Sequence, residues 1–313
     1  MEFQHKPVLL NECIENLNIK ENGIYLDGTI GGAGHASLIY KKLNNDGILI
    51  GLDQDEIALK ASDDRLKDIN KKAKIYLVNS NFKNIKKICK ELDVEGLDGV
   101  ILDLGVSSYQ LDEGERGFSY NKDAFLDMRM DIKNELNAYK VINEYSEESL
   151  KKVILNYGEE KWGSRIAKFI VSSRQKKAIE TTKELVDIIK AAIPCRARRE
   201  GSHPAKKTFQ SIRIEVNNEL EILEQTIEDI ISILNPKGRL CIITFHSLED
   251  RIVKKEYLKK TYHCMCPRSF PICICNSKAI VNLINKKPIL PSNNEIEDNI
   301  RARSAKLRIL EKI

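Results

Sequence analysis

A glycine-rich stretch, residues 23–35 (GIYLDGTIGGAGH), constrains the fold of this chain more than any other part of the sequence. It begins as an apolar run ending in an acid, its glycines predict a tight turn, and a helical pattern follows. Glycines let the backbone adopt positive φ angles and let a ligand approach closely, and the helix start offers unpaired N–H groups. Such a unit is typical of nucleotide or nucleoside binding. The glycines at 28, 31, 32 and 34 do not follow the G-x-G-x-x-G spacing, so an ordinary strand-to-helix turn remains the alternative.

A second strand end carries an acid about one βαβ unit later. Residues 47–52 are apolar and lead directly to Asp53. A carboxylate at this place accepts hydrogen bonds from both ribose hydroxyls of a bound nucleoside. The two segments together predict a nucleoside site without identifying the nucleoside.

Strand and helix patterns alternate through the first third of the chain, which predicts a parallel sheet covered on both faces. From residue 110 the alternation ends and helical patterns follow without strands. The sheet pattern then resumes with an apolar helical stripe over 209–234 and a strand over 239–245. We therefore predict an α/β core formed by residues 1–112 and 206–313, interrupted by an inserted α-helical domain at 113–205.

Composition excludes a membrane-spanning protein. Of the 313 residues, 42% are hydrophobic and 31% are charged, and no apolar run approaches the length of a membrane span. The first residues lack the apolar core of a signal peptide. We expect a cytoplasmic protein with no membrane partner.

Positive charge is concentrated in one segment. Between Lys161 and Arg213 there are 14 Lys or Arg residues against 4 Asp or Glu residues. Its densest run, 196–207, is either a solvated loop or a surface that faces phosphates. On the second interpretation the candidate RNA contacts are Arg198, Arg199, Lys206 and Lys207.

Four of the eight cysteines form the pattern C-x-C-x6-C-x-C. Disulfides are not expected in a reducing cytoplasm, whereas four thiolates suit a structural zinc ion. The C-x-C spacing is tighter than the usual zinc pairing, so either zinc or ordinary thiols fit Cys264, Cys266, Cys273 and Cys275.

Two further residues mark the expected ligand edge of the sheet. Asp103 ends the fourth predicted strand, and a buried acid there is costly unless it has a partner, which favours a ligand role. Phe82 follows the third strand and either stacks on a purine or belongs to the core.

Five ordered motifs resemble those of the ribosomal RNA small subunit methyltransferase H family, also called the MraW family. The likeness extends from residues 5–10 to residues 303–307, nearly the whole chain. The motifs are DGTIGGAGH at 27–35, DLGVSS at 103–108, LDMRMD at 126–131, HPAKKTFQ at 203–210 and FHSLEDR at 245–251. Tyr109 and Phe125 stand where proline is common in the family, and Lys207 stands where arginine is common.

The resemblance implies an S-adenosylmethionine-dependent enzyme that methylates the exocyclic N4 of a decoding-centre cytidine in 16S rRNA. It implies a class I, Rossmann-like methyltransferase fold with a helical insertion, the small ribosomal subunit as partner and no DNA partner. We assign no metal ligands to this site. The implied cofactor contacts are Ala33, Gly34, His35, Asp53, Phe82, Asp103 and Gln110.

Asp103 is the candidate catalytic residue, as acceptor of a hydrogen bond from the target amino group. Ser107, Ser108 and His246 are other candidates at strand ends, with turn or capping roles as their alternatives. Three other functions stay open on the residues alone: a DNA amino methyltransferase, a non-catalytic nucleoside-binding RNA clamp, and a nicotinamide dehydrogenase, which the glycine spacing disfavours.

Overall fold

The computed structural model describes residues 7–69, 72–106, 114–198, 203–261 and 278–313. The chain forms two compact units, which we call unit 1 (Met1–Gly105 with Leu220–Ile313) and unit 2 (Val106–Glu219). The predicted insertion at 113–205 lies inside unit 2, which extends beyond it on both sides. Among the described residues, no helix combines the length and apolar character needed to cross a membrane.

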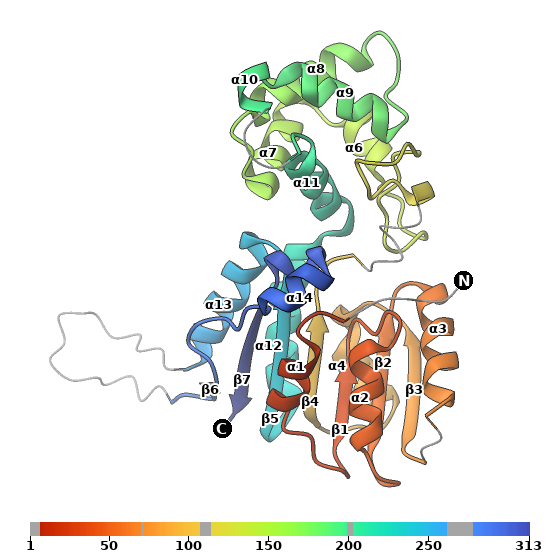
Figure 1. The fold of residues 1–313 in the computed structure, drawn as a ribbon, viewed down its shortest axis with the longest axis vertical. Helices are drawn as coiled ribbons and strands as arrows, with labels where there is room; N and C mark the ends of the chain where they lie inside the picture. Colours follow the sequence, from red (N-terminus) through yellow and green to blue (C-terminus); the bar gives the residue numbers. More distant parts are fainter. Residues whose placement is uncertain (1–6, 70–71, 107–113, 199–202, 262–277) are drawn as a thin grey trace, which may run out of the picture. The chain divides into compact units, whose positions relative to one another are not determined.

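Unit 1 is built on a seven-stranded sheet in the order β3-β2-β1-β4-β5-β7-β6 (Figure 1). The first five strands in this order are parallel, whereas β7 is antiparallel to β5 and β6 is antiparallel to β7. The predicted, mostly parallel α/β arrangement is therefore confirmed. The strands are β1 (Ile24–Asp27), β2 (Ile48–Asp53), β3 (Lys74–Asn79), β4 (Leu97–Asp103), β5 (Leu234–Thr244), β6 (Val281–Leu283) and β7 (Lys306–Lys312).

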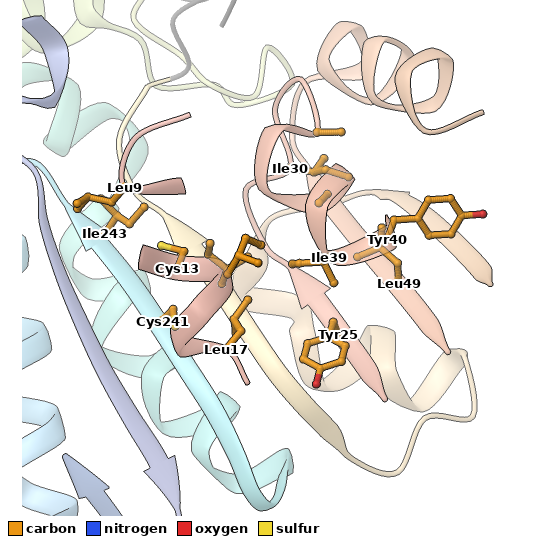
Figure 2. Packing of buried hydrophobic residues seen from close by; sticks show 14 of the residues in the cluster. Leu9, Cys13, Leu17, Tyr25, Ile30, Ile39, Tyr40, Leu49, Cys241 and Ile243 are labelled. Carbon is orange, nitrogen blue, oxygen red and sulfur yellow. The ribbon is translucent and has the colours of Figure 1, made fainter. Parts of the chain in front are cut away.

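Each face of the sheet packs against its own layer of helices, because neighbouring side chains of a strand point to opposite faces. In β1, Tyr25 belongs to one cluster and Leu26 to the other. The Tyr25 cluster, seen closely in Figure 2, includes residues of α1 (Leu10–Asn16), α2 (Gly34–Lys42) and α3 (Glu56–Lys67). The Leu26 cluster includes residues of α4 (Ile85–Glu91), α12 (Glu219–Ile233) and α13 (Ser247–Thr261).

The remaining short elements of unit 1 follow the strands at its edges. They are η1 (Phe82–Asn84), α14 (Asn293–Asp298) and η3 (Ile300–Ser304). The sequence interpretation did not anticipate β6 or α14, since three to six residues are too few for a periodic pattern.

Unit 2 has its own apolar core, formed by helices. Thr181 and Glu184 form a capping box at the start of its helix α9. Its elements are η2 (Gly114–Arg116), α6 (Ala138–Glu144), α7 (Glu147–Gly158), α8 (Gly163–Arg174), α9 (Thr182–Ala192), α10 (Cys195–Arg198) and α11 (Lys206–Asn217).

The prediction of one continuous helix over 209–234 is wrong, because two helices, α11 and α12, cover this range. Asn218 adopts a left-handed conformation with φ 49° and ends α11. Asn217 fixes this end: its side-chain oxygen accepts from the Met130 N–H at 2.8 Å, and its amide donates to the Met128 carbonyl at 2.8 Å. The apolar spacing continues across the break because both helices have a buried stripe, so periodicity alone concealed it.

Candidate functional site

Three carboxylates lie at one edge of the sheet in unit 1. Asp27, Asp53 and Asp103 end β1, β2 and β4, which are neighbouring parallel strands. Carboxyl ends of parallel strands meet at one edge, where open α/β sheets bind ligands. Burial, together with the charge of Asp53, raises the pKa of Asp27 to about 7.

The glycine-rich loop after β1 is tied to both neighbouring strands. The Gly28 N–H donates to the Ile101 carbonyl in β4 at 3.0 Å, and the Ile30 N–H donates to the Leu52 carbonyl in β2 at 2.9 Å. Gly31 has a φ of +51°. Ala33, with φ 56°, directly precedes α2 and is fully buried, and its N–H donates to the Ile30 carbonyl at 2.7 Å.

Asp53 faces the glycine-rich loop, as the ribose assignment requires. Its Oδ2 accepts from the Gly31 N–H at 2.9 Å, and its Oδ1 accepts from the Asp55 N–H at 2.9 Å. Burial raises the pKa of this carboxyl to about 6. Each carboxylate oxygen keeps a second lone pair, so these bonds orient Asp53 without exhausting its capacity to accept hydrogen bonds.

Two side chains from α3 hold the carbonyls of the same loop. The fully buried Ser62 donates its hydroxyl to the Gly31 carbonyl at 2.6 Å. Arg65 donates from Nη1 to the Gly32 carbonyl at 3.1 Å. Sequence reasoning missed both residues, because a serine and an arginine on a charged amphipathic helix carry no distinguishing signal.

Asp103 combines burial with an unused oxygen. Its backbone N–H donates to Thr29 Oγ1 at 2.7 Å, and its Oδ2 lies 4.0 Å from His35 Nδ1. Its Oδ1 is buried and has no hydrogen-bond partner among the described residues. Burial, with the charges of Asp27 and Glu249, raises the pKa of Asp103 to about 8. Buried polar atoms are nearly always hydrogen-bonded, so Oδ1 of Asp103 suits a donor group that does not belong to the described residues.

His35 and Gly34 begin α2 and have structural partners of their own. His35 is 4% exposed, and its Nε2 lies 3.1 Å from the Val8 carbonyl oxygen. A Cβ at Gly34 would lie 2.2 Å from Pro7 Cγ, so this glycine is required by the packing of the preceding segment. The structure thus brings His35 to Asp103, whereas Gly34 serves the close contact with Pro7.

Phe82 lies in η1, half-buried, against the Leu26 cluster. A Cβ at Gly28 would meet Leu102 Cδ2 at 2.5 Å and Phe82 Cβ at 3.3 Å. Phe82 therefore flanks the first glycine of the loop while belonging in part to the core. Gln110, Ser107 and Ser108 lie outside the described residues.

His246 serves as a helix cap. Its Nδ1 accepts from the Glu249 N–H at 3.3 Å, while Glu249 Oε2 accepts from the Phe245 N–H at 2.7 Å. These reciprocal bonds satisfy N–H groups at the start of α13. The capping alternative considered for His246 accounts for its Nδ1 contact, while its Nε2 lies 3.1 Å from Glu249 Oε1.

Of the four basic candidates, three lie among the described residues of unit 2. Arg198 ends α10 and contacts Cys195 Sγ at 2.6 Å. Lys206 and Lys207 begin α11 and are exposed, and Lys207 donates to the Glu159 carbonyl at 2.8 Å. Arg199 and the four clustered cysteines from Cys264 to Cys275 lie outside the described residues.

The strand order, the loop after β1 and the acid after β2 define the class I, Rossmann-like methyltransferases, as the sequence predicted. The family model described as the MraW methylase family matches residues 2–313. The chain belongs to this family, and S-adenosylmethionine is its methyl donor.

Curated relatives match along their full lengths. The protein named ribosomal RNA small subunit methyltransferase H from Acetivibrio thermocellus is 64% identical over 313 residues, covering 100% of both chains. The protein of the same name from Clostridioides difficile is 57% identical, again with 100% of both chains covered.

A solved structure described as a putative rRNA-methylase from Clostridium thermocellum covers 99% of this chain and 100% of its own. It is 11% identical with a TM-score of 0.48. A score below 0.5 is too low to support an argument about fold or function.

Proposed function

We propose that this protein transfers a methyl group from S-adenosylmethionine to the exocyclic N4 of a decoding-centre cytidine in 16S rRNA. The relatives that match the whole chain are named as small subunit rRNA methyltransferases, which supports an rRNA substrate. We also propose that the substrate is the rRNA within the small ribosomal subunit and that the reaction takes place in the cytoplasm. The observation that carries the proposed function is the full-length family match combined with the buried Oδ1 of Asp103, which has no hydrogen-bond partner in the described part of the chain.

The residues at the sheet edge fit an adenosyl group. Asp53 is oriented by two backbone N–H groups and keeps lone pairs for the ribose hydroxyls. Gly34 and His35 begin α2 and Ala33 directly precedes it, so all three lie at the N-terminal end of this helix, and Phe82 flanks the loop beside Gly28. These assignments, with Gln110, are part of the proposal.

The donor supplies an already activated sulfonium methyl group, so the protein's main task is alignment of the attacking nitrogen. Asp103 is proposed to accept a hydrogen bond from the target amino group at Oδ1, which has no hydrogen-bond partner among the described residues. This bond would localise the nitrogen lone pair, which is otherwise delocalised into the ring. The proton leaves to water after transfer, so no dedicated base is required.

Binding of the RNA substrate is proposed to require contacts between basic side chains and phosphates, and a target base that is unstacked. Exocyclic amino groups are accessible to such an enzyme only when the base leaves its stack. Arg198, Arg199, Lys206 and Lys207 are proposed to contact phosphates, since backbone charge dominates nucleic-acid affinity.

The test is transfer of labelled methyl groups to small ribosomal subunits that lack the modification, followed by mass spectrometry of nucleosides. We expect N4-methylated cytidine with the wild-type protein and at least a tenfold lower rate with Asp53→Ala. Transfer to DNA, with none to the small subunits, would replace the proposal by a DNA amino methyltransferase. Binding of donor and RNA without any methylated product would make the protein a non-catalytic clamp.

A further inference from the structure

Two aromatic rings of unit 2 stack face to face, and one of them, His203, belongs to the basic segment. The rings of Tyr120 and His203 have centroids 4.5 Å apart and planes inclined by 6°. Tyr120 also meets Phe209 edge to face, with centroids 5.9 Å apart and an angle of 84°. Neither contact belongs to the donor site, which lies in unit 1.

The three rings are ordered from the core outward. Phe209 is 3% exposed and belongs to the unit 2 core, Tyr120 packs partly against that core, and His203 lies on Tyr120. His203 is partly exposed, and its Nδ1 accepts from the Ala205 N–H at 3.2 Å, which fixes the ring. His203 is thus a fixed, partly exposed ring that has a second ring stacked on one of its faces.

Burial and the charge of Lys190 act on His203 and lower its pKa, so its imidazole is biased toward the neutral form. Lys206, three residues along the chain, is exposed and has no ion pair among the described residues. A neutral, rigid ring beside cations matches an unpaired nucleotide, whose base stacks while its phosphate meets the charge.

We propose that His203, supported by Tyr120, is a stacking platform for one unpaired base of single-stranded RNA. Lys190 and Lys206 provide the neighbouring positive charge. The proposal rests on the proposed function, because it assigns to unit 2 a contact with the RNA substrate beyond its phosphates. Tyr120 acts as a positioning residue that keeps the His203 ring in place.

The test is a double-mutant cycle between protein and RNA. The probe is a fluorescent, mixed-sequence, single-stranded RNA, together with a series in which one nucleotide at a time is abasic. We expect one abasic position to weaken binding to the wild-type protein about tenfold, the typical size of one base–aromatic stack. That loss is expected to vanish with His203→Leu and to persist with His203→Phe, which keeps a stacking ring.

Two control variants separate stacking from other effects. Lys206→Ala should weaken all RNAs equally and keep the abasic loss. Phe125→Leu disrupts another stacked pair of the same unit, in which the rings of Phe125 and Tyr139 have centroids 5.6 Å apart. This variant should change neither the RNA affinity nor the loss caused by the abasic position.

The proposal is overturned if the wild-type protein shows no abasic-sensitive position, or if His203→Leu leaves the abasic loss unchanged. A uniform loss across all RNAs with His203→Leu, without coupling, would show that the stack only supports the fold. Oligonucleotide binding does not require methyl transfer. Coupling without methylation of small subunits would therefore leave the platform standing while refuting the proposed function.

Discussion

At the scale of single residues, Asp103 is the most unusual group of the sheet edge. Its carboxyl lies near Asp27 and Glu249, whose charges add to the effect of burial and raise its pKa to about 8. The unliganded protein therefore holds this group largely protonated at neutral pH. The donor carries positive charge on its sulfonium, which favours the ionised carboxylate.

This linkage predicts a pH-dependent affinity for the donor. Below pH 8, binding releases the Asp103 proton, so affinity should rise by up to about tenfold per pH unit and level off above the raised pKa. Isothermal titration across pH 6 to 9 in buffers of different ionisation enthalpy measures both affinity and proton release. Asp103→Asn should flatten the dependence, and an unchanged slope in this variant would exclude Asp103 as the linked group.

At the scale of elements, the glycine-rich loop is fixed from three directions. Strand β4 accepts from Gly28, Asp53 at the end of β2 accepts from Gly31, and α3 supports the carbonyls through Ser62 and Arg65. The loop is therefore organised before a ligand arrives.

Two glycines of this loop should respond differently to alanine. At Gly28 a Cβ would lie 2.5 Å from the buried Leu102 Cδ2, so Gly28→Ala should lower the free energy of unfolding by about 1–3 kcal/mol. At Gly31 an added Cβ would lie 3.8 Å from its nearest neighbour, the Thr29 carbonyl oxygen, so only the left-handed φ disfavours a side chain. Gly31→Ala should therefore lower the free energy of unfolding by about 1–2 kcal/mol. Urea denaturation compares them, and the larger loss at Gly31 would contradict the packing argument.

Ser62→Ala tests the support from α3. Removing the hydroxyl leaves the Gly31 carbonyl without this donor and should lower the free energy of unfolding by about 1 kcal/mol. Because the Gly31 N–H orients Asp53, donor affinity should also fall. Titration of the donor measures this loss. Ser211→Ala removes a buried hydroxyl of unit 2 that donates to the Thr208 carbonyl at 2.8 Å; it serves as the control and should leave the donor affinity unchanged.

The sequence was sufficient for the parallel strands and for the three acids at their ends, because apolar runs ending in charge are a local signal. It failed where the determinant is a contact between distant segments. The break at Asn218 depends on Asn217 reaching Met128 and Met130, and the support of Gly31 comes from Ser62. Neither pairing is visible in a linear pattern.

At the scale of the whole molecule, the basic segment and the proposed donor site belong to different units. The acids of the sheet edge belong to unit 1, and the basic segment between Lys161 and Arg213 belongs to unit 2. One unit thus carries the groups suited to a cationic donor and the other carries those suited to a polyanion.

RNA binding should accordingly depend on salt through unit 2. Replacing both Arg198 and Lys206 by alanine should reduce the slope of log affinity against log salt by about 1.4 for single-stranded RNA. Fluorescence anisotropy over a salt series gives the slope. Lys67→Ala, which removes a surface lysine of α3 in unit 1, is the matched control. An unaltered slope in the double variant would favour the other interpretation of residues 196–207, a solvated loop that does not contact phosphates.

The placement of β7 between β5 and β6 has a consequence for biosynthesis. Residues 281–283 emerge from the ribosome before residues 306–312, yet their only strand partner in the described sheet is β7. Until β7 is made, β5 exposes an unpaired, apolar margin. Nascent chains stalled before residue 306 are therefore expected to need a chaperone, whereas the contiguous unit 2 is free to fold earlier during translation.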